Sequence, residues 1–159
     1  MQLNPDLAKL LEERQENRQT LTLVTGVFDL LHGEHHQFLA KAKVLADLLI
    51  VGLESDQRVT QLKGEGRPLN SAPVRQRNLM AWNLADQVFI LPPAFAKPEG
   101  RESLLRKIKP DFLAVSSNSP FLDQKRQALA KINGEVVVVH QFNPRISSTK
   151  LIDDKERKQ

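Results

Sequence analysis

The sequence has 159 residues, of which 40% are hydrophobic and 26% charged, and this composition excludes a disordered tail and a collagen-like chain. The absence of cysteine excludes disulfides, thiolate metal sites and cysteine nucleophiles, and favours a cytoplasmic location. The net charge of +4 suits a phosphate-bearing ligand at least as well as a nucleic acid. No stretch is apolar for long enough to span a bilayer, and the first residues lack the features of a signal peptide. We therefore expect a soluble cytoplasmic protein with no membrane partner. We also expect no nucleic-acid partner, because the chain lacks interleaved aromatic residues and an aligned basic helix.

The chain begins with a predicted helix. Asn4 is a suitable N-cap, Pro5 suits the first helical position, and the leucines at 7, 10 and 11 share one face. A polar run over residues 15–19 ends this segment. Residues 1–19 are thus expected to form a helical extension ahead of a core over residues 20–155.

Beyond this extension, short β-prone runs alternate with segments of helical spacing. The predicted strands occupy residues 21–25, 48–53, 88–91, 112–115 and 136–139. The predicted helices occupy residues 35–45, 56–62, 73–84, 101–109 and 121–132, with a last helix from Ser147. Such alternation indicates right-handed crossovers. We therefore predict one domain over residues 1–159, a Rossmann-like three-layer α/β fold whose five-stranded parallel sheet has helices on both faces.

In such sheets, ligands bind beyond the carboxyl ends of the strands. After the first predicted strand, His32 and His35 stand where a loop enters a helix. Imidazoles at this place can donate to phosphate oxygens, and the amino end of a helix favours anions. Gly26 allows the backbone to approach a ligand closely. Taken alone, two such histidines are more often surface residues at a helix start, but their position after the strand, with Gly26, Phe28 and Asp29 ahead, favours a ligand site.

This segment resembles the signature Gly-x-Phe-Asp-x-x-His-x-Gly-His of the cytidylyltransferase-like nucleotidyltransferases. Gly26, Phe28, Asp29, His32 and His35 match it in place. The resemblance implies that the two histidines contact nucleotide phosphates and stabilise the transition state as an acceptor phosphate attacks the α-phosphorus. It also implies nucleotide contacts for the loop that includes Val27.

One residue departs from the signature. Glu34 stands where the family has the glycine before its second histidine. A carboxylate beside a triphosphate site repels the ligand, and its side chain fills space that glycine leaves open. Two interpretations follow: Glu34 points away and activity survives, or the site is weakened or specialised.

Residues 61–70 are similar to the bacterial heptose-phosphate adenylyltransferase branch of the family. In that branch a lysine and an arginine of this region reach the phosphates, and Lys63 and Arg75 match them by position. A solvated lysine beside an exposed turn is the alternative interpretation for Lys63. With the histidine motif in place, we favour a phosphate contact, because a lysine side chain can follow the β- and γ-phosphates.

Two further segments carry nucleotide-binding candidates. Ser147, Ser148 and Thr149 lie in a run similar to the family's Ile-Ser-Thr-Thr-Lys-Ile, and hydroxyls that open a helix can cradle phosphate or simply cap the helix. After the fourth predicted strand, Ser117 and Asn118 replace the glycine and aspartate found in many relatives. They could bond a base edge or merely form a turn, so the choice between ATP and CTP stays open.

The resemblance as a whole implies a nucleotidyltransferase. It would transfer a nucleotidyl group from ATP or CTP to a phosphorylated small molecule, a sugar or polyol phosphate, with release of pyrophosphate. Mg²⁺ is expected to accompany the nucleotide, with Asp29 as a candidate ligand. Homodimers are common in the family. The alternative hypothesis is a catalytically weakened or silent relative that binds nucleotide.

Overall fold

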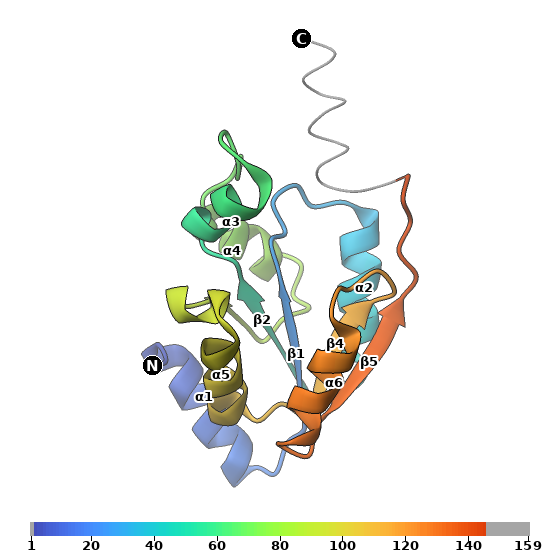
Figure 1. Ribbon diagram of the computed structural model, residues 1–159. Coiled ribbons are helices and arrows are strands. Elements are labelled where there is room, and N and C mark those ends of the chain that lie inside the picture. Colours follow the sequence, from blue (N-terminus) through green and yellow to red (C-terminus); the bar gives the residue numbers. More distant parts are fainter. Residues whose placement is uncertain (1, 146–159) are drawn as a thin grey trace.

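The computed structural model describes residues 2–145 (Figure 1). Its strands are β1 (Leu21–Gly26), β2 (Leu48–Leu53), β3 (Gln87–Ile90), β4 (Phe112–Ser116) and β5 (Glu135–His140). Its helices are α1 (Pro5–Glu16), α2 (Gly33–Lys43), α3 (Asp56–Lys63), α4 (Ala72–Met80), the 3₁₀ helix η1 (Pro93–Ala96), α5 (Pro98–Ile108) and α6 (Leu122–Ala130). The predicted alternation of strands and helices is confirmed.

All five strands pair in parallel, in the order β3-β2-β1-β4-β5. The strand order reverses between β1 and β4, because β2 and β3 lie to one side of β1 and β4 and β5 to the other. The β1–β2 ladder runs the full length of both strands, from Leu21 opposite Leu48 to Gly26 opposite Leu53. The β1–β4 ladder pairs Thr22 and Leu23 with β4. The carboxyl halves of β1 and β4 therefore diverge, which opens the sheet at the point of reversal.

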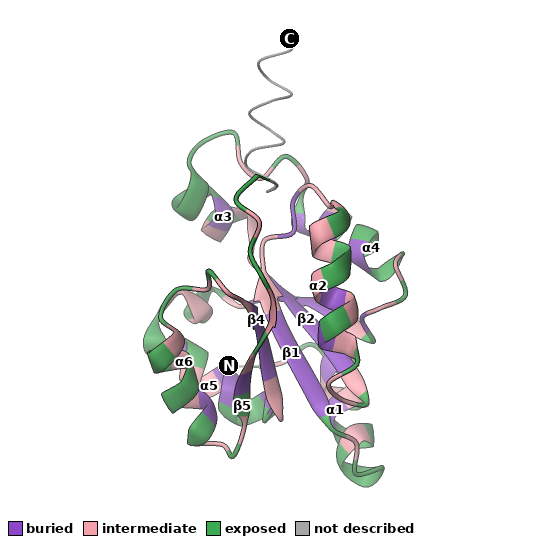
Figure 2. Ribbon diagram, turned by 90° about the vertical axis from the view of Figure 1, so that its right-hand side faces the viewer, coloured by how far each residue is buried: buried purple, intermediate pink, exposed green. Residues whose placement is uncertain are grey.

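Two apolar layers hold helices against the sheet. On one face, α1, α5 and α6 pack through leucines such as Leu7, Leu104 and Leu129. On the other face, α2 and α4 pack through Leu39 and Leu79. Because successive side chains of a strand point to opposite faces, the apolar runs of β1 and β2 supply both layers. Figure 2 shows these strands buried between helices whose outer sides are exposed, so the predicted three-layer architecture is confirmed.

Several helix boundaries differ from those predicted. The helix expected over residues 73–84 ends at Met80, and Asn83 adopts the left-handed backbone conformation, with φ of 55°. In the same way α6 ends at Ala130, ahead of Asn133 with φ of 61°. Asparagine tolerates this conformation better than most residues, so it suits the end of a helical segment.

Within residues 2–145, no helix is long and apolar enough to cross a membrane. The helix predicted from Ser147 lies outside the described residues.

Candidate functional site

A cavity of about 550 Å³ lies at the carboxyl ends of β1, β4 and β5, where the strand order reverses. This is the position expected for the ligand site of an open parallel sheet. Its walls combine the loop after β1, the first turns of α2, the end of α3 and the segments that follow β4 and β5. The candidate residues among its lining are Gly26, Val27, Phe28, His32, His35, Lys63 and Asn118.

The turn after β1 brings the two histidines into the cavity. Phe28 has a left-handed backbone, with φ of 50°, and its ring folds back over Gly26. A β-carbon at position 26 would lie 2.8 Å from that ring, so the turn requires glycine. The Phe28 ring also lies against His35, with centroids 5.2 Å apart. The aromatic side chain of the motif thus supports a catalytic candidate.

His32 and His35 stack on each other, with ring centroids 3.8 Å apart and planes inclined by 20°. His32 is the N-cap of α2 and His35 lies in its first turn. Both ring nitrogens of His32 and Nδ1 of His35 are buried and have no hydrogen-bond partner among the described residues. Buried polar atoms are normally satisfied, so these nitrogens point to a ligand that supplies the partner.

The electrostatics of the histidine pair keep it uncharged in the free protein. Burial, the neighbouring His32 and Lys63 together lower the pKa of His35 to about 3. Burial also lowers the pKa of His32, although the Glu34 carboxylate acts in the opposite direction. An anion bound beside the rings would act against this lowering of the pKa, because it favours the charged imidazolium form.

Lys63 reaches the cavity from the last turn of α3. Burial and the neighbouring Arg67 lower its pKa, whereas Asp29 raises it. Lys125, which was not among the predicted site residues, lines the wall formed by the loop after β4 and α6. Its ammonium donates to Ser119 Oγ at 2.7 Å, and burial lowers its pKa. Lysine side chains thus line two walls of the cavity.

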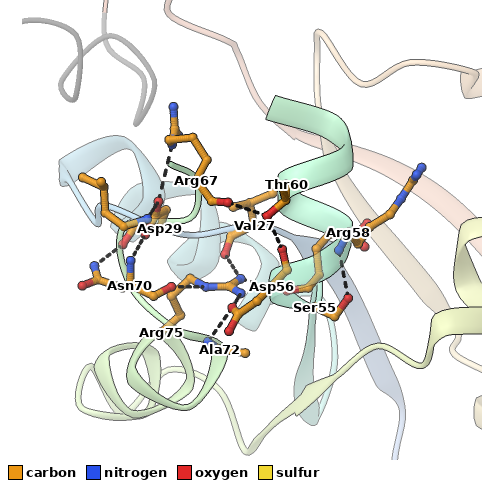
Figure 3. Close-up of polar contacts among 12 residues, drawn as sticks. Val27, Asp29, Ser55, Asp56, Arg58, Thr60, Arg67, Asn70, Ala72 and Arg75 are labelled. Carbon is orange, nitrogen blue, oxygen red and sulfur yellow. Dashed lines mark hydrogen bonds and ion pairs between the residues drawn. The ribbon is translucent and has the colours of Figure 1, made fainter. Parts of the chain in front are cut away.

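Asp29 holds a loop together and does not line the cavity. The residue is 1% exposed, and its two carboxylate oxygens accept hydrogen bonds from the backbone amides of Leu69 and Asn70, at 2.7 and 2.9 Å (Figure 3). Arg67 Nε lies 3.8 Å from the same carboxylate. These contacts fasten the loop after α3 to the loop that leads from β1 to the histidines.

Arg75 is likewise fully buried within the protein. Its guanidinium donates to the carbonyl oxygens of Asn70, Val27 and Glu54, at 3.0, 2.8 and 2.9 Å, and to Asp56 Oδ1 at 2.7 Å (Figure 3). With 0% of the residue exposed, the side chain has no surface to offer a phosphate. The structure therefore gives Arg75 a bracing position beneath the site in place of the expected ligand contact.

The two nucleotide-binding candidates in the loop after β4 differ in position, because Asn118 lines the cavity and Ser117 does not. Ser117 is tied to the end of β5: its amide donates to the His140 carbonyl oxygen at 2.9 Å, and its hydroxyl accepts from the Phe142 amide at 2.8 Å. Asn118 lines the cavity, and its side-chain oxygen accepts from Ser116 at 2.6 Å. Ser147, Ser148 and Thr149 lie outside the described residues.

The structure adds lining residues that sequence reasoning did not select. Glu54 follows β2, and burial raises its pKa. His140 ends β5 and contacts Glu34, which itself lines the cavity. A histidine directly after the run of valines in β5 was the available signal for His140, whereas nothing in the sequence distinguished Lys125 from other helical lysines.

The described residues do not form a metal centre of their own. No group of three or more His, Asp or Glu side chains within residues 2–145 is placed to hold a metal ion. Asp29, the candidate ligand, uses its carboxylate oxygens for backbone amides. Any Mg²⁺ that takes part would be held chiefly by the phosphates of its nucleotide.

Together, the fold and the cavity define a Rossmann-like α/β protein with its ligand site at the reversal point of a parallel sheet. The model of one such family, described as cytidylyltransferase-like, matches residues 23–154. The chain belongs to this family.

Individual relatives agree with this assignment. The chain is 40% identical over 112 residues to "Bifunctional protein HldE" of Helicobacter pylori strain G27, which covers 70% of this chain and 23% of the relative. It is 33% identical over 144 residues to the protein of the same name from Pseudomonas entomophila, covering 90% of this chain and 29% of the relative. The matched region therefore spans about a quarter of the length of these curated relatives.

Solved structures match the fold. A lipopolysaccharide core biosynthesis protein from Thermoplasma volcanium superposes with a TM-score of 0.60 at 21% identity, over 79% of this chain and 97% of the other. Pantothenate synthetase from Thermus thermophilus superposes with a TM-score of 0.58 at 14% identity, over 93% of this chain and 68% of the other. At these identities the likeness concerns the fold alone.

Proposed function

We propose that the chain transfers a nucleotidyl group from ATP or CTP to a phosphorylated small molecule, a sugar or polyol phosphate, and releases pyrophosphate. The observation that carries this proposal is the stacked pair of His32 and His35, whose buried ring nitrogens have no partner among the described residues. Family membership supports the reaction type, and the similarity of residues 61–70 to the heptose-phosphate branch supports the acceptor class.

The reaction needs no covalent enzyme intermediate. An oxygen of the acceptor phosphate attacks the α-phosphorus, and the bond from that phosphorus to the oxygen bridging to the β-phosphate breaks. Pyrophosphate leaves with the bridging oxygen and its electron pair. Catalysis of such a transfer rests on positioning the reactants and on stabilising charge on the phosphate oxygens.

The proposed roles of the side chains follow from their chemistry. Each imidazole ring carries at least one N–H, so His32 and His35 can both donate to non-bridging oxygens of the α-phosphate. Lys63 would place its ammonium near the β- and γ-phosphates and stabilise the leaving pyrophosphate. Because the histidines are neutral in the free protein, binding of the nucleotide would draw protons onto the pair.

The proposal is tested by combining a binding screen with an assay of pyrophosphate release. Thermal stability is measured with ATP, CTP, GTP and UTP, each with Mg²⁺, and release is assayed with a panel of phosphorylated alcohols. We expect stabilisation that grows with the logarithm of the concentration of ATP or CTP, together with acceptor-dependent release. No shift with any nucleotide would contradict the proposal.

A silent nucleotide-binding protein is the second candidate. The observation in its favour is Glu34, whose carboxylate lines the cavity in place of the signature glycine. Two results together would favour this candidate. A nucleotide stabilises the wild type, but the wild type releases no pyrophosphate with any acceptor. The Glu34→Gly variant, in contrast, gains pyrophosphate release. Release by the wild type that equals that of Glu34→Gly would exclude it.

A further inference from the structure

Glu34 is not a free carboxylate in the cavity, because residues of α2 and β5 hold it in place. Glu34, Phe38 and Lys41 follow one another at spacings of four and three residues, so they share one face of α2. His140, at the end of β5, packs against that face. Its ring contacts the Glu34 carboxylate, lies edge-on to Phe38 with centroids 6.4 Å apart, and lies 3.2 Å from Lys41 Nζ.

The partners of His140 fix the direction of its hydrogen bonds. An ammonium group has donors and no acceptor, so Lys41 Nζ donates to Nδ1 of His140. With Nδ1 as the acceptor, Nε2 is the donor of the ring, and it donates to Glu34 Oε2. The chain of contacts thus runs from Lys41 through His140 to Glu34, and a positive and a negative charge stand at its two ends.

This arrangement leaves one carboxylate oxygen available. Oε2 accepts from His140, whereas no described residue donates to Oε1. The side chain lines the cavity and is 22% exposed, so the available oxygen is accessible to a ligand there. A carboxylate repels phosphate but accepts hydrogen bonds from hydroxyl groups, and such charge-assisted bonds are among the stronger ones.

The position of Glu34 beside the histidines favours the hydroxyls of the ribose. It lies between His32 and His35 in the sequence, on the same first turn of α2, and its charge raises the pKa of His32. In the proposed reaction these histidines hold the α-phosphate. The ribose is joined directly to that phosphate, whereas the acceptor's carbon skeleton is one phosphate further away.

We infer that Glu34, oriented by His140 and Lys41, binds the ribose hydroxyls of the nucleotide and makes the site select ribonucleotides over nucleotides that lack both hydroxyls. This inference rests on the proposed function, because it takes the α-phosphate to lie at the histidines. Glu34 is then a specificity residue in place of the glycine, and His140 and Lys41 are positioning residues.

The test compares binding of ATP and CTP with binding of their 2′,3′-dideoxy forms by titration calorimetry, in the absence of an acceptor. For the wild type we expect the dideoxy form to bind about 10-fold or more weakly, since it leaves the carboxylate without a hydroxyl partner. Glu34→Gly should bind both forms with nearly equal affinity. Glu34→Gln, which keeps the size and one acceptor oxygen, should discriminate by an intermediate factor.

Lys41→Met tests the positioning role, because Lys41 is an exposed residue of α2 whose replacement should not prevent folding. We expect this variant to bind the ribonucleotide with less advantage over the dideoxy form than the wild type does. A merely structural change would weaken the binding of both nucleotides equally. Lys107→Met is the matched control: Lys107 is exposed on α5, across the sheet from α2, and this variant should keep the wild-type ratio.

The outcomes separate this inference from the proposed function. Nucleotide binding with equal affinity for both forms in the wild type, or an unchanged ratio in Glu34→Gly, would overturn the inference alone. The inference would also be overturned if Glu34→Gly kept the ratio of ribonucleotide to dideoxynucleotide affinity but bound phosphorylated acceptors more weakly. That result would place the hydroxyl contact on the acceptor. Absence of any nucleotide binding would overturn both proposals.

Discussion

The buried guanidinium of Arg75 donates a hydrogen bond of 2.8 Å to the carbonyl oxygen of Val27. Through this contact α4 supports the loop that leads from β1 into the two histidines. The same nitrogen, Nη1, also donates to the carbonyl oxygen of Glu54, which follows β2. One arginine side chain therefore fixes the spacing of two neighbouring strand ends beneath the candidate site.

Removal of this brace should destabilise the fold. Arg75→Met leaves the Val27 and Glu54 carbonyl groups without their donor, and we expect a loss of about 2–4 kcal/mol in the free energy of unfolding. Arg77→Met, at an exposed position of the same helix, should change it by less than about 0.5 kcal/mol. Urea denaturation of both variants measures the difference. Equal stability of the two, with nucleotide binding lost only in Arg75→Met, would instead support a direct phosphate contact.

Asp29 should contribute to the stability of the fold and not to metal binding. In Asp29→Asn a side-chain NH₂ replaces one of the oxygens that accept from Leu69 and Asn70, so one buried amide loses its partner. We expect a loss of about 1–3 kcal/mol in unfolding free energy, without a change in the Mg²⁺ concentration that supports half-maximal activity. A large rise in that concentration at unchanged stability would return Asp29 to the role of a metal ligand.

The low pKa of His35 predicts a dependence of stability on pH. In the folded protein His35 is neutral down to a pKa of about 3, whereas the unfolded chain binds a proton below about 6.5. The unfolded state is therefore favoured as the pH falls below 6.5, by up to about 1.4 kcal/mol per pH unit. His35→Asn should lose stability less steeply over this range. Urea denaturation at pH 7, 6 and 5 compares the two proteins, and parallel losses would contradict the assigned pKa.

Lys63 should matter more for triphosphates than for monophosphates. We expect Lys63→Met to weaken binding of ATP or CTP about 10-fold or more, while binding of AMP or CMP changes little, because the ammonium would contact the β- and γ-phosphates. Lys107→Met, with the same change of charge on an exposed helix, serves as the control. Titration calorimetry gives both affinities. Equal weakening of mono- and triphosphate binding would place Lys63 elsewhere.

The sequence was sufficient to predict the architecture and the place of the site. Consecutive apolar residues, as in β2, indicate a strand covered on both faces, and alternation with helices indicates a parallel sheet. The rule that ligands bind at strand carboxyl ends then selected His32 and His35, which the structure brings together in the cavity.

The sequence could not show which polar residues face the cavity and which lie beneath it. Arg75 and Asp29 match family positions, but their direction depends on carbonyl and amide groups of loops that come together only in the fold. The partner of Glu34 was equally inaccessible, because His140 lies 106 residues away along the chain and reaches α2 through the packing of β5. Local patterns carry no information on such long-range pairs.

We propose that the stacked histidines serve nucleotidyl transfer, and a comparison of His35 with its neighbour His36 tests this role. His35 lines the cavity, whereas the adjacent His36 is exposed and lies edge-on to Trp82, with centroids 5.0 Å apart. The measurement is the rate at which label passes from the α-phosphate of ATP or CTP to a phosphorylated acceptor. We predict that His35→Asn lowers this rate by about 10²-fold or more and that His36→Asn leaves it within about 2-fold of the wild type. Equal rates for the wild type and a folded His35→Asn variant would show that His35 has no part in the transfer.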